Sequence, residues 1–173
     1  MTLMRALKFF AGLAVAALTG CAGYHVGPIN GALVAPGQSI EILPFNNQTL
    51  QPRLGDELTK AARERLQTDG SYHLATRDPA AVVITGTITF YGRESVNFLS
   101  ADAATPENYR VGLTVHVVIR ERADGRLLLE RNLKPHILVH IGPDLASAER
   151  QALPLIAADF ASDLVSLLSE SAW

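Results

Sequence analysis

The sequence predicts an α+β fold, a two-layer sandwich in which two helices cover one face of a mostly antiparallel sheet of about four strands. Segments in which apolar and polar residues alternate are flanked by two segments in which apolar residues recur every three or four positions. Alternation is typical of a strand with one buried face, and the longer period is typical of a helix with one buried stripe. Two such stripes bury themselves most simply against a single sheet face.

The N-terminal segment has the features of a secretory signal peptide. Arg5 and Lys8 precede an apolar run over residues 9–18, which is followed by small residues and Cys21. The run is about half of the roughly 20 residues that a membrane-spanning helix needs, so residues 1–20 are predicted to be a cleaved signal. Leu-Thr-Gly-Cys at its end resembles the lipobox of bacterial lipoproteins. This resemblance implies that Cys21 carries diacylglycerol on its thiol and an acyl chain such as palmitate on its new amine.

Composition and charge narrow the classes of protein. Without residues 1–20 the chain has 153 residues and a net charge of −4, from 13 basic and 17 acidic side chains. This length suits one domain with a substantial core. A weakly acidic chain lacks the basic face that nucleic-acid binding needs, and no second apolar stretch is expected to span a membrane. Ala22, rather than Asp, follows Cys21, which indicates the outer membrane by resemblance to enterobacterial sorting rules.

The mature chain is predicted to consist of a tether and one domain. Residues 21–37 are rich in glycine and proline and predict a lipidated tether with little regular structure, whereas residues 38–173 predict a single α+β domain. A strand is expected over residues 39–43, before a polar turn that contains Asn46 and Asn47.

The first helix is predicted to run from Pro52 to Asp69. Proline is favourable at the first helical position, and Gly70 suits the left-handed position that ends many helices. Lys60 and Glu64 are four residues apart and are expected to pair on the exposed face. The expected buried stripe contains Leu54, Leu58, Ala61, Ala62 and Leu66.

Two strands and a loop are predicted after this helix. A short strand is expected over residues 72–75, and a longer alternating strand over residues 82–91. Residues 97–107 are polar and predict a loop. In the longer strand, Val82, Ile84, Ile88 and Phe90 are expected on the buried face, and Thr85, Thr87 and Thr89 on the other.

A hairpin and a final helix complete the prediction. The longest strand is expected over residues 109–121, and Asp124-Gly125 predicts a turn to a strand over residues 126–134. Val111, Leu113, Val115, Val117 and Ile119 are expected on its buried face, and Arg110, Thr114, His116 and Arg120 on the other. The last helix is expected to start within a few residues of Pro154, although the proline alternatively kinks a longer helix from about Ser147. Its stripe comprises Ala157, Phe160, Ala161, Leu164, Leu167 and Leu168.

Motifs of catalysis and metal binding are missing from the sequence. It contains no G-x-S-x-G, no phosphate-binding loop, no H-E-x-x-H and no C-x-x-C. His136 and His140 lie four residues apart in a segment that reads as extended chain, which separates them by about 13 Å, too far to share one ion. No catalytic residue, metal or cofactor is therefore expected.

The order of the motifs resembles that of the LPS-assembly lipoprotein LptE family. Cys21 is followed by Gly-Tyr-His, then by Ile-Leu-Pro-Phe-Asn-Asn-Gln-Thr-Leu at residues 42–50 and an amphipathic helix, and then by Val-Ile-Thr-Gly-Thr-Ile at 83–88 and Tyr-Arg-Val at 109–111. The resemblance implies a non-catalytic lipoprotein, anchored in the outer membrane and facing the periplasm. It also implies a partner, the LPS-inserting β-barrel LptD, which the protein would plug, and contact with LPS in transit.

Contact with LPS needs cations, because its lipid A and core phosphates are anionic. The predicted loop 97–107 has none. The candidates lie on or near the strands, where the alternative interpretation is ordinary charges that discourage sheet-to-sheet association. These candidates are Arg93, Arg110, Arg120, Arg131 and Lys134.

Two other functions remain open from the sequence. A strand ending in Ile-Leu-Pro-Phe-Asn-Asn before an amphipathic helix also resembles lipoprotein activators of peptidoglycan synthases and curli-secretion lipoproteins. The first class usually has a long disordered tether, and residues 22–37 are short for one. The second class is usually larger.

Overall fold

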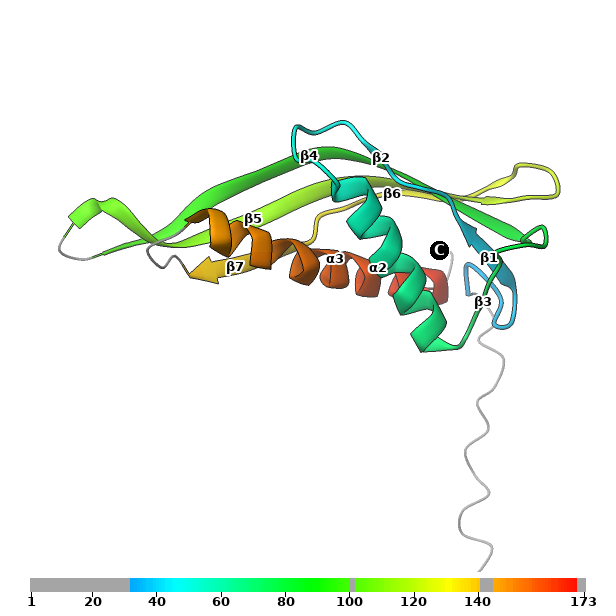
Figure 1. The fold of residues 1–173 in the computed structure, drawn as a ribbon. Helices are drawn as coiled ribbons and strands as arrows, with labels where there is room; N and C mark the ends of the chain where they lie inside the picture. The colour runs from blue at the N-terminus through cyan, green and yellow to red at the C-terminus, as the bar shows by residue number, and fades with distance from the viewer. Residues whose placement is uncertain (1–31, 100–101, 141–144, 171–173) are drawn as a thin grey trace, which may run out of the picture. The chain divides into compact units, whose positions relative to one another are not determined.

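The structure, a computed structural model, describes residues 32–99, 102–140 and 145–170. The chain divides into two units, Met1–Asn30 and Gly31–Trp173, and every described residue belongs to the second. In this second unit a twisted sheet forms one layer and helices α2 (Leu54–Asp69) and α3 (Leu145–Ser169) form the other, both on the same face of the sheet (Figure 1). The predicted α+β class and the placement of both helices are therefore observed.

The sheet has seven strands of mixed direction, so the prediction of about four mostly antiparallel strands was wrong. The strand order is β3-β1-β4-β5-β6, with β2 beside β4 and β7 beside β5. β1 is parallel to both β3 and β4, because α2 carries the chain back to the same end of the sheet before β3 begins. The strands are β1 (Ser39–Ile42), β2 (Asn46–Asn47), β3 (His73–Leu74), β4 (Val82–Leu99), β5 (Asp102–Glu121), β6 (Leu127–Leu133) and β7 (His136–His140).

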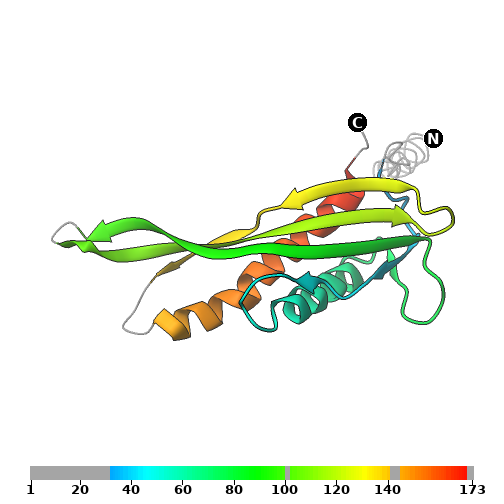
Figure 2. The same ribbon diagram turned by 90° about the horizontal axis from the view of Figure 1, so that it is seen from above.

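A long hairpin of β4 and β5 forms the centre of the sheet, as the view from above shows (Figure 2). The pairing continues to Leu99 and Asp102, so residues 97–99 and 102–107 are strand, and the predicted loop was wrong for them. Its register shifts twice between Asn97 and Leu99. A strand in such a hairpin is held by backbone hydrogen bonds to its partner, and these bonds do not require apolar alternation in the sequence.

A β-bulge in β4 changes which side chains face the helices. The register shifts between Ile88 and Phe90, which places Phe90 opposite Thr114 on the outer face, the face away from the helices. Phe90 is 57% exposed, so its predicted burial was wrong. The one extra residue of a bulge reverses the alternation that follows it. Before the bulge the predicted pattern holds, with Val82, Ile84 and Ile88 buried.

Helix α2 starts two residues later than predicted. It begins at Leu54, and Arg53 has a left-handed conformation (φ 61°), so Pro52 lies outside the helix. At the other end Gly70 (φ 74°) donates its N–H to the carbonyl of Leu66 at 3.4 Å, which confirms the predicted cap. The Lys60–Glu64 pair is formed at 3.9 Å. The predicted stripe is buried except for Ala61, which is half-buried.

Helix α3 contains Pro154 in its interior, so the prediction of a start near that residue was wrong and the longer helix is correct. Proline removes one helical hydrogen bond at a cost of about 3 kcal/mol. Ala152 and Ile156 are buried on either side of Pro154, and their packing offsets that cost. Contrary to prediction, Arg150–Ser169 is long and apolar enough to cross a membrane by length and composition alone. Half of this stretch is buried within the fold, as expected of a core helix.

The core lies between the sheet and the two helices. The rings of Phe45 and Phe160 meet edge to face with centroids 5.4 Å apart, and they join the segment after β1 to α3. The buried hydroxyl of Thr59 accepts the N–H of Phe45 at 2.9 Å and donates to the carbonyl of Gly55 at 2.6 Å. These bonds satisfy the polar groups of the β1–α2 connection inside an apolar interior.

The chain before β1 contacts the end of α3. The N–H groups of Leu33 and Val34 donate to the carbonyls of Glu170 and Leu168 at 2.9 and 3.2 Å, and Val34 is buried. Cys21 and the predicted signal peptide lie outside the residues that the structure describes.

Candidate functional site: a groove on the outer face of the sheet

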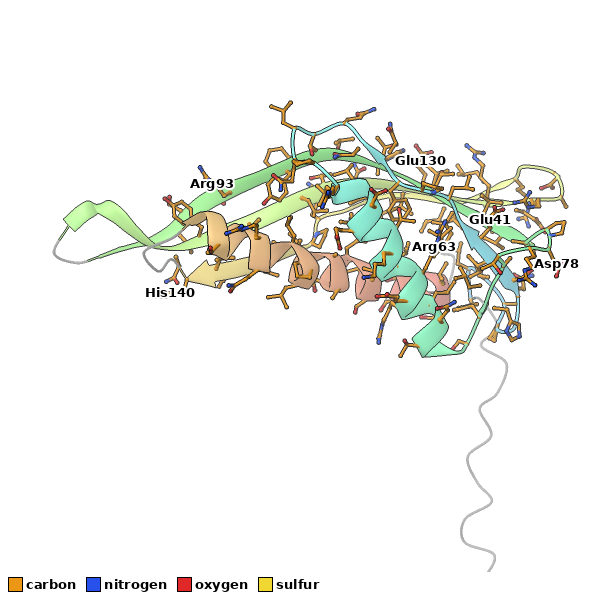
Figure 3. All side chains as sticks on the ribbon, viewed as in Figure 1. Glu41, Arg63, Asp78, Arg93, Glu130 and His140 are labelled. Atoms are coloured by element: carbon orange, nitrogen blue, oxygen red, sulfur yellow. The ribbon has the colours of Figure 1, made fainter. Side chains whose placement is uncertain are left out.

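The structure brings three of the five predicted cations together. Arg93, Arg110 and Lys134 line one groove of about 460 Å³ that opens on the outer face of the sheet. It lies where β4, β5 and the β6–β7 connection meet. Figure 3 shows Arg93 on the part of β4 that leads to the hairpin tip, well separated along the sheet from Glu130 on β6.

A pair of glycines forms the floor of this groove. Gly92 and Gly112 lie directly opposite each other in the β4–β5 register, so no side chain covers the sheet at this rung. The ring of Phe90 folds over Gly92, where an added Cβ would come within 2.5 Å of its Cζ atom. A Cβ on Gly112 would make only ordinary contacts, the nearest being the Cβ of His136 at 3.7 Å. The open part of the floor is therefore over Gly112.

The walls of the groove combine apolar surface with cations. Phe90 and Thr114 form one wall, and Glu94 and Arg110 the other, with Arg110 3.6 Å from the Glu94 carboxylate. Both of these charged side chains are well exposed, so the pair contributes at most about 1 kcal/mol and leaves Arg110 able to exchange partners. Such a site suits a molecule with both an apolar part and an anionic group.

The end of the groove is closed by residues of the β6–β7 connection. Lys134 has no ion-pair partner within the described ranges. His136 follows the buried Pro135 and also lies near α3. There, burial and the neighbouring Asp159 carboxylate raise the pKa of Asp163, and His136 is close enough to oppose that rise.

The other two predicted cations serve different parts of the fold. Arg120 donates to the carbonyl of Gly125 at 3.1 Å, which supports the β5–β6 turn. Arg131 lies on the helix side of β6 and pairs with Glu170, just beyond the end of α3, at 2.9 Å. Both residues thus make contacts within the fold and lie away from the groove.

The outer face beside the groove is polar and hydrogen-bonded. The Thr85 and Thr89 hydroxyls donate to the carbonyls of Val118 and Thr114, both at 3.4 Å. His116 lies 3.1 Å from the Glu130 carboxylate and 3.0 Å from the Asn132 side-chain oxygen. This pattern agrees with the face predicted to carry threonines and charges.

Sequence analysis missed Phe90, Gly92, Gly112 and His136 as parts of this site. A glycine inside a strand often marks a bulge or a close approach of another group, and that signal was present at Gly92 and Gly112. The pairing of the two glycines depends on the bulge in β4, which the sequence pattern does not show.

No cluster of three metal-ligating side chains occurs among the residues that the structure places. His136 and His140 lie in strand β7, as the extended-chain interpretation predicted, and His140 instead contacts Asn108 at 3.1 Å.

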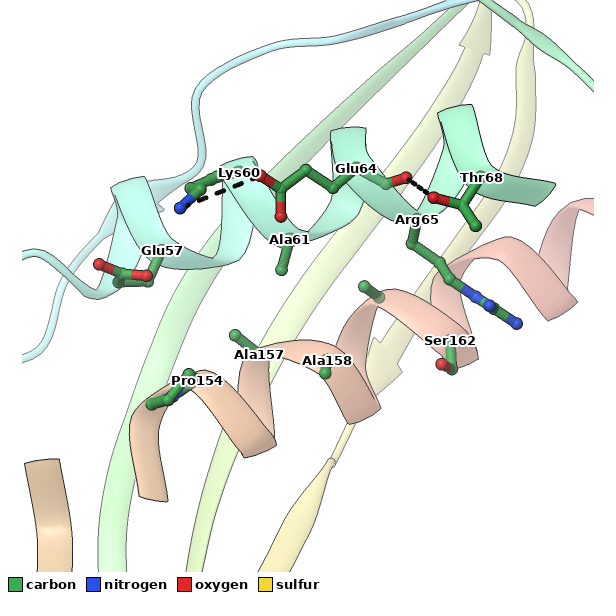
Figure 4. Close-up of a pocket in the computed structure, with 11 residues that line it drawn as sticks. Glu57, Lys60, Ala61, Glu64, Arg65, Thr68, Pro154, Ala157, Ala158 and Ser162 are labelled. Atoms are coloured by element: carbon green, nitrogen blue, oxygen red, sulfur yellow. Dashed lines mark hydrogen bonds and ion pairs between the residues drawn. The ribbon is translucent and has the colours of Figure 1, made fainter. Parts of the chain in front are cut away.

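A second groove, of about 370 Å³, lies between α2 and α3 (Figure 4). Ala61, Ala157 and Ala161 are among its lining residues, and Glu57, Lys60, Glu64 and Arg65 supply charges on its α2 side. Its α3 side is uncharged. None of the five cations predicted for LPS contact lines this second groove.

A two-layer α+β domain with an open, polar outer sheet face and a cation-lined groove is typical of a binding protein and offers no catalytic constellation among its described residues. The sequence model of the LptE family, described as lipopolysaccharide-assembly, matches residues 37–168. Because this match covers most of the chain, the chain belongs to the LptE family of lipopolysaccharide-assembly proteins. None of the curated proteins compared with the chain matches it.

Several solved structures share the fold at low sequence identity. A protein from Xanthomonas campestris is 13% identical with a TM-score of 0.58, over 79% of this chain and 88% of that one. A PelC dodecamer from Paraburkholderia phytofirmans is 15% identical with a TM-score of 0.53, over 82% and 94%. A minor lipoprotein from Acinetobacter baumannii is 14% identical with a TM-score of 0.51, over 75% and 90%. These likenesses concern the fold alone.

Proposed function

We propose that the protein is an outer-membrane lipoprotein that plugs and supports the LPS-inserting β-barrel LptD and contacts LPS as it passes. The observation that carries this proposal is the family match over residues 37–168, joined to a groove that suits an anionic amphiphile. The family is defined by lipopolysaccharide assembly and not by a catalysed reaction. Binding to a partner and to LPS is then the function itself.

The character of the outer sheet face supports the proposal that the partner is a barrel. Wide outer-membrane barrels present mainly polar side chains to their lumen, and this face carries threonines, His116 and Arg110. The helices and the core occupy the other face, so the polar face is available without unfolding any element. Lipid on Cys21 would keep the domain at the membrane and raise its effective concentration near the barrel.

The groove supports direct contact with LPS. Lys134, Arg110 and Arg93 supply the cations for phosphate groups, and Phe90 and the glycine floor supply apolar surface for acyl chains. Of the five residues predicted for LPS contact, the proposal therefore keeps these three and leaves out Arg120 and Arg131.

Capture of the partner tests the proposal. The tagged full chain is extracted in mild detergent, captured, and analysed by mass spectrometry, with an untagged strain as control. We expect one large outer-membrane barrel in a one-to-one ratio. Recovery of a peptidoglycan synthase, or of a homo-oligomeric ring without a barrel, would instead favour the two alternative classes. The dodecameric PelC structure shares only the fold and does not decide between them.

A further inference from the structure

Each element that connects two parts of the described domain carries, at nearly the same level, a feature that weakens its regular structure: a bulge, a glycine or a proline. We name these parts by their residues: the body comprises residues 32–90, 114–133 and 155–170, and the arm comprises residues 92–99, 102–112, 136–140 and 145–153. The elements that join them are β4, β5, the β6–β7 connection and α3. We propose that the arm and the body are joined by a hinge that passes through the outer-face groove.

The two central strands are weakened close to one rung, although β5 stays paired there without a register shift. β4 has its bulge between Ile88 and Phe90, two residues before Gly92, and a bulge locally interrupts the ladder of hydrogen bonds. β5 has Gly112 directly opposite Gly92. Cross-strand side-chain pairs are a main source of sheet stability, and this rung has none on either strand.

The third strand is interrupted at this same rung. β6 ends at Leu133 and β7 begins at His136, which pairs with Gly112. Between them, Pro135 has no N–H to donate, and its carbonyl accepts the N–H of Leu113 at 3.2 Å. A strand that would otherwise brace the hairpin along its whole edge is therefore divided into two shorter pieces.

The helix beneath the sheet has its own break. Pro154 removes the hydrogen bond to the carbonyl of Arg150 and favours bending there. It lies beside Glu57, in the first turn of α2, at one end of the α2–α3 groove (Figure 4). The turns of α3 before Pro154 extend past α2 towards β7 (Figure 1). The proline therefore weakens the helix at this point, although Ala152 before it remains buried.

One such irregularity alone would only curve a sheet or a helix. Here all four connections carry a feature that weakens them at nearly the same level, although β4, β5 and α3 each continue across it. Hinges between rigid parts commonly consist of a few such positions that absorb backbone rotation.

The hinge sets the width of the groove. Phe90 and Lys134 lie on the body side of the glycine rung, and Glu94 and Arg110 lie on the arm side. Bending at the rung changes the separation of Lys134 and Arg110, the two cations that face each other across the floor. A ligand or partner that touches both walls stabilises one angle between the arm and the body. The hinge is a property of the isolated protein and does not depend on the identity of the partner.

Distance measurements by electron paramagnetic resonance test the hinge. Spin labels on unnatural amino acids at Thr85 in the body and Leu138 in the arm leave Cys21 untouched; both sites are exposed. Their β5 partners, Val118 and Arg110, are eight residues apart, or roughly 26 Å along the strand. The control pair, Thr85 and Gln67, lies within the body. We expect the arm–body distance distribution to be about twofold broader than the body distribution.

Two substitutions sharpen the test. Gly112→Val adds a side chain whose Cβ meets only ordinary contacts, and valine favours extended backbone. Pro154→Ala restores a helical N–H. Together they should narrow the arm–body distribution to about the width of the control pair and leave the control pair unchanged. If Gly112→Val impairs folding, Gly112→Ala provides the same comparison. A wild-type arm–body distribution as narrow as the control, or one that the substitutions do not narrow, would overturn the hinge. Neither result bears on capture of the barrel.

Discussion

The side chain of Lys134 lies at the rim of the groove, beyond the end of β6 and next to the buried Pro135. Its position is set by the backbone, because Pro135 ties the β6–β7 connection to Leu113. Arg110 reaches the same groove from β5. Lys134 and Arg110 together can engage a pair of phosphates, while Arg120 and Arg131 are held by contacts elsewhere.

Substitution of Lys134 tests the role of these cations. Lys134→Ala should weaken binding of the lipoprotein to purified LPS by about fivefold, or about 1 kcal/mol, the value typical of an exposed ionic contact. Arg120→Ala is the matched control and should leave binding unchanged, because Arg120 lies at the β5–β6 turn. Titration of each variant with LPS by fluorescence measures the effect. Equal affinities of the Lys134→Ala variant and the wild type for LPS would show that the groove does not bind LPS.

A second residue-scale prediction concerns Asp163 on α3. Burial and Asp159 raise the pKa of its carboxyl group in the folded state, so the unfolded chain ionises first as pH rises, and this residue lowers stability at neutral pH. Asp163→Asn should therefore raise the denaturant midpoint at pH 7. The gain should vanish below the ordinary carboxyl pKa of 3.8, where both states are protonated. A gain of the same size at pH 3 and pH 7 would show that the carboxylate charge is not the cause.

At the scale of elements, the two helices stabilise the sheet through one apolar stripe each. Leu58 is 0% exposed and Leu164 is 1% exposed, and both belong to the core between the layers. Leu58→Ala and Leu164→Ala should each destabilise the fold by about 2–5 kcal/mol, through lost burial and a residual cavity. Leu50→Ala is the control, because Leu50 is 102% exposed. Urea denaturation would contradict this packing if the two core variants and the control had the same midpoint.

Helical periodicity was sufficient to predict α2 and the buried face of α3. It failed at the first residue of each helix, since helix starts depend on tertiary contacts. Arg53 adopts a left-handed conformation after Pro52, and packing on both sides of Pro154 carries α3 through a residue that usually disrupts a helix.

Alternation predicted the whole buried face of β5, and that of β4 as far as Ile88. Beyond it, the bulge inverted the pattern and exposed Phe90. Strands β2 and β7 are short and polar or mixed, and they are strands because β4 and β5 offer hydrogen-bonding edges to them. Of the site, the sequence predicted the cations but not the glycine floor, since which glycines meet is decided by cross-strand register.

At the scale of the whole molecule, we propose that lipid on Cys21 determines the location of the protein. Acyl chains bind membranes with about 0.8 kcal/mol per buried methylene, and two or more chains give stable anchoring. Mass spectrometry of the mature N-terminus should find cleavage before Cys21 and acylation of that residue. Cys21→Ser, as the control, should leave the leader attached. An unmodified Cys21, or cleavage elsewhere, would exclude a lipid anchor.

The central claim is that this lipoprotein assembles lipopolysaccharide. The most direct measurement is the amount of LPS at the cell surface when the chain is depleted from the bacterium that encodes it, with the wild-type chain restored from a plasmid as control. The account predicts that surface LPS falls on depletion and recovers on restoration, while the total LPS of the cell does not fall. Unchanged surface LPS in depleted cells would contradict the account.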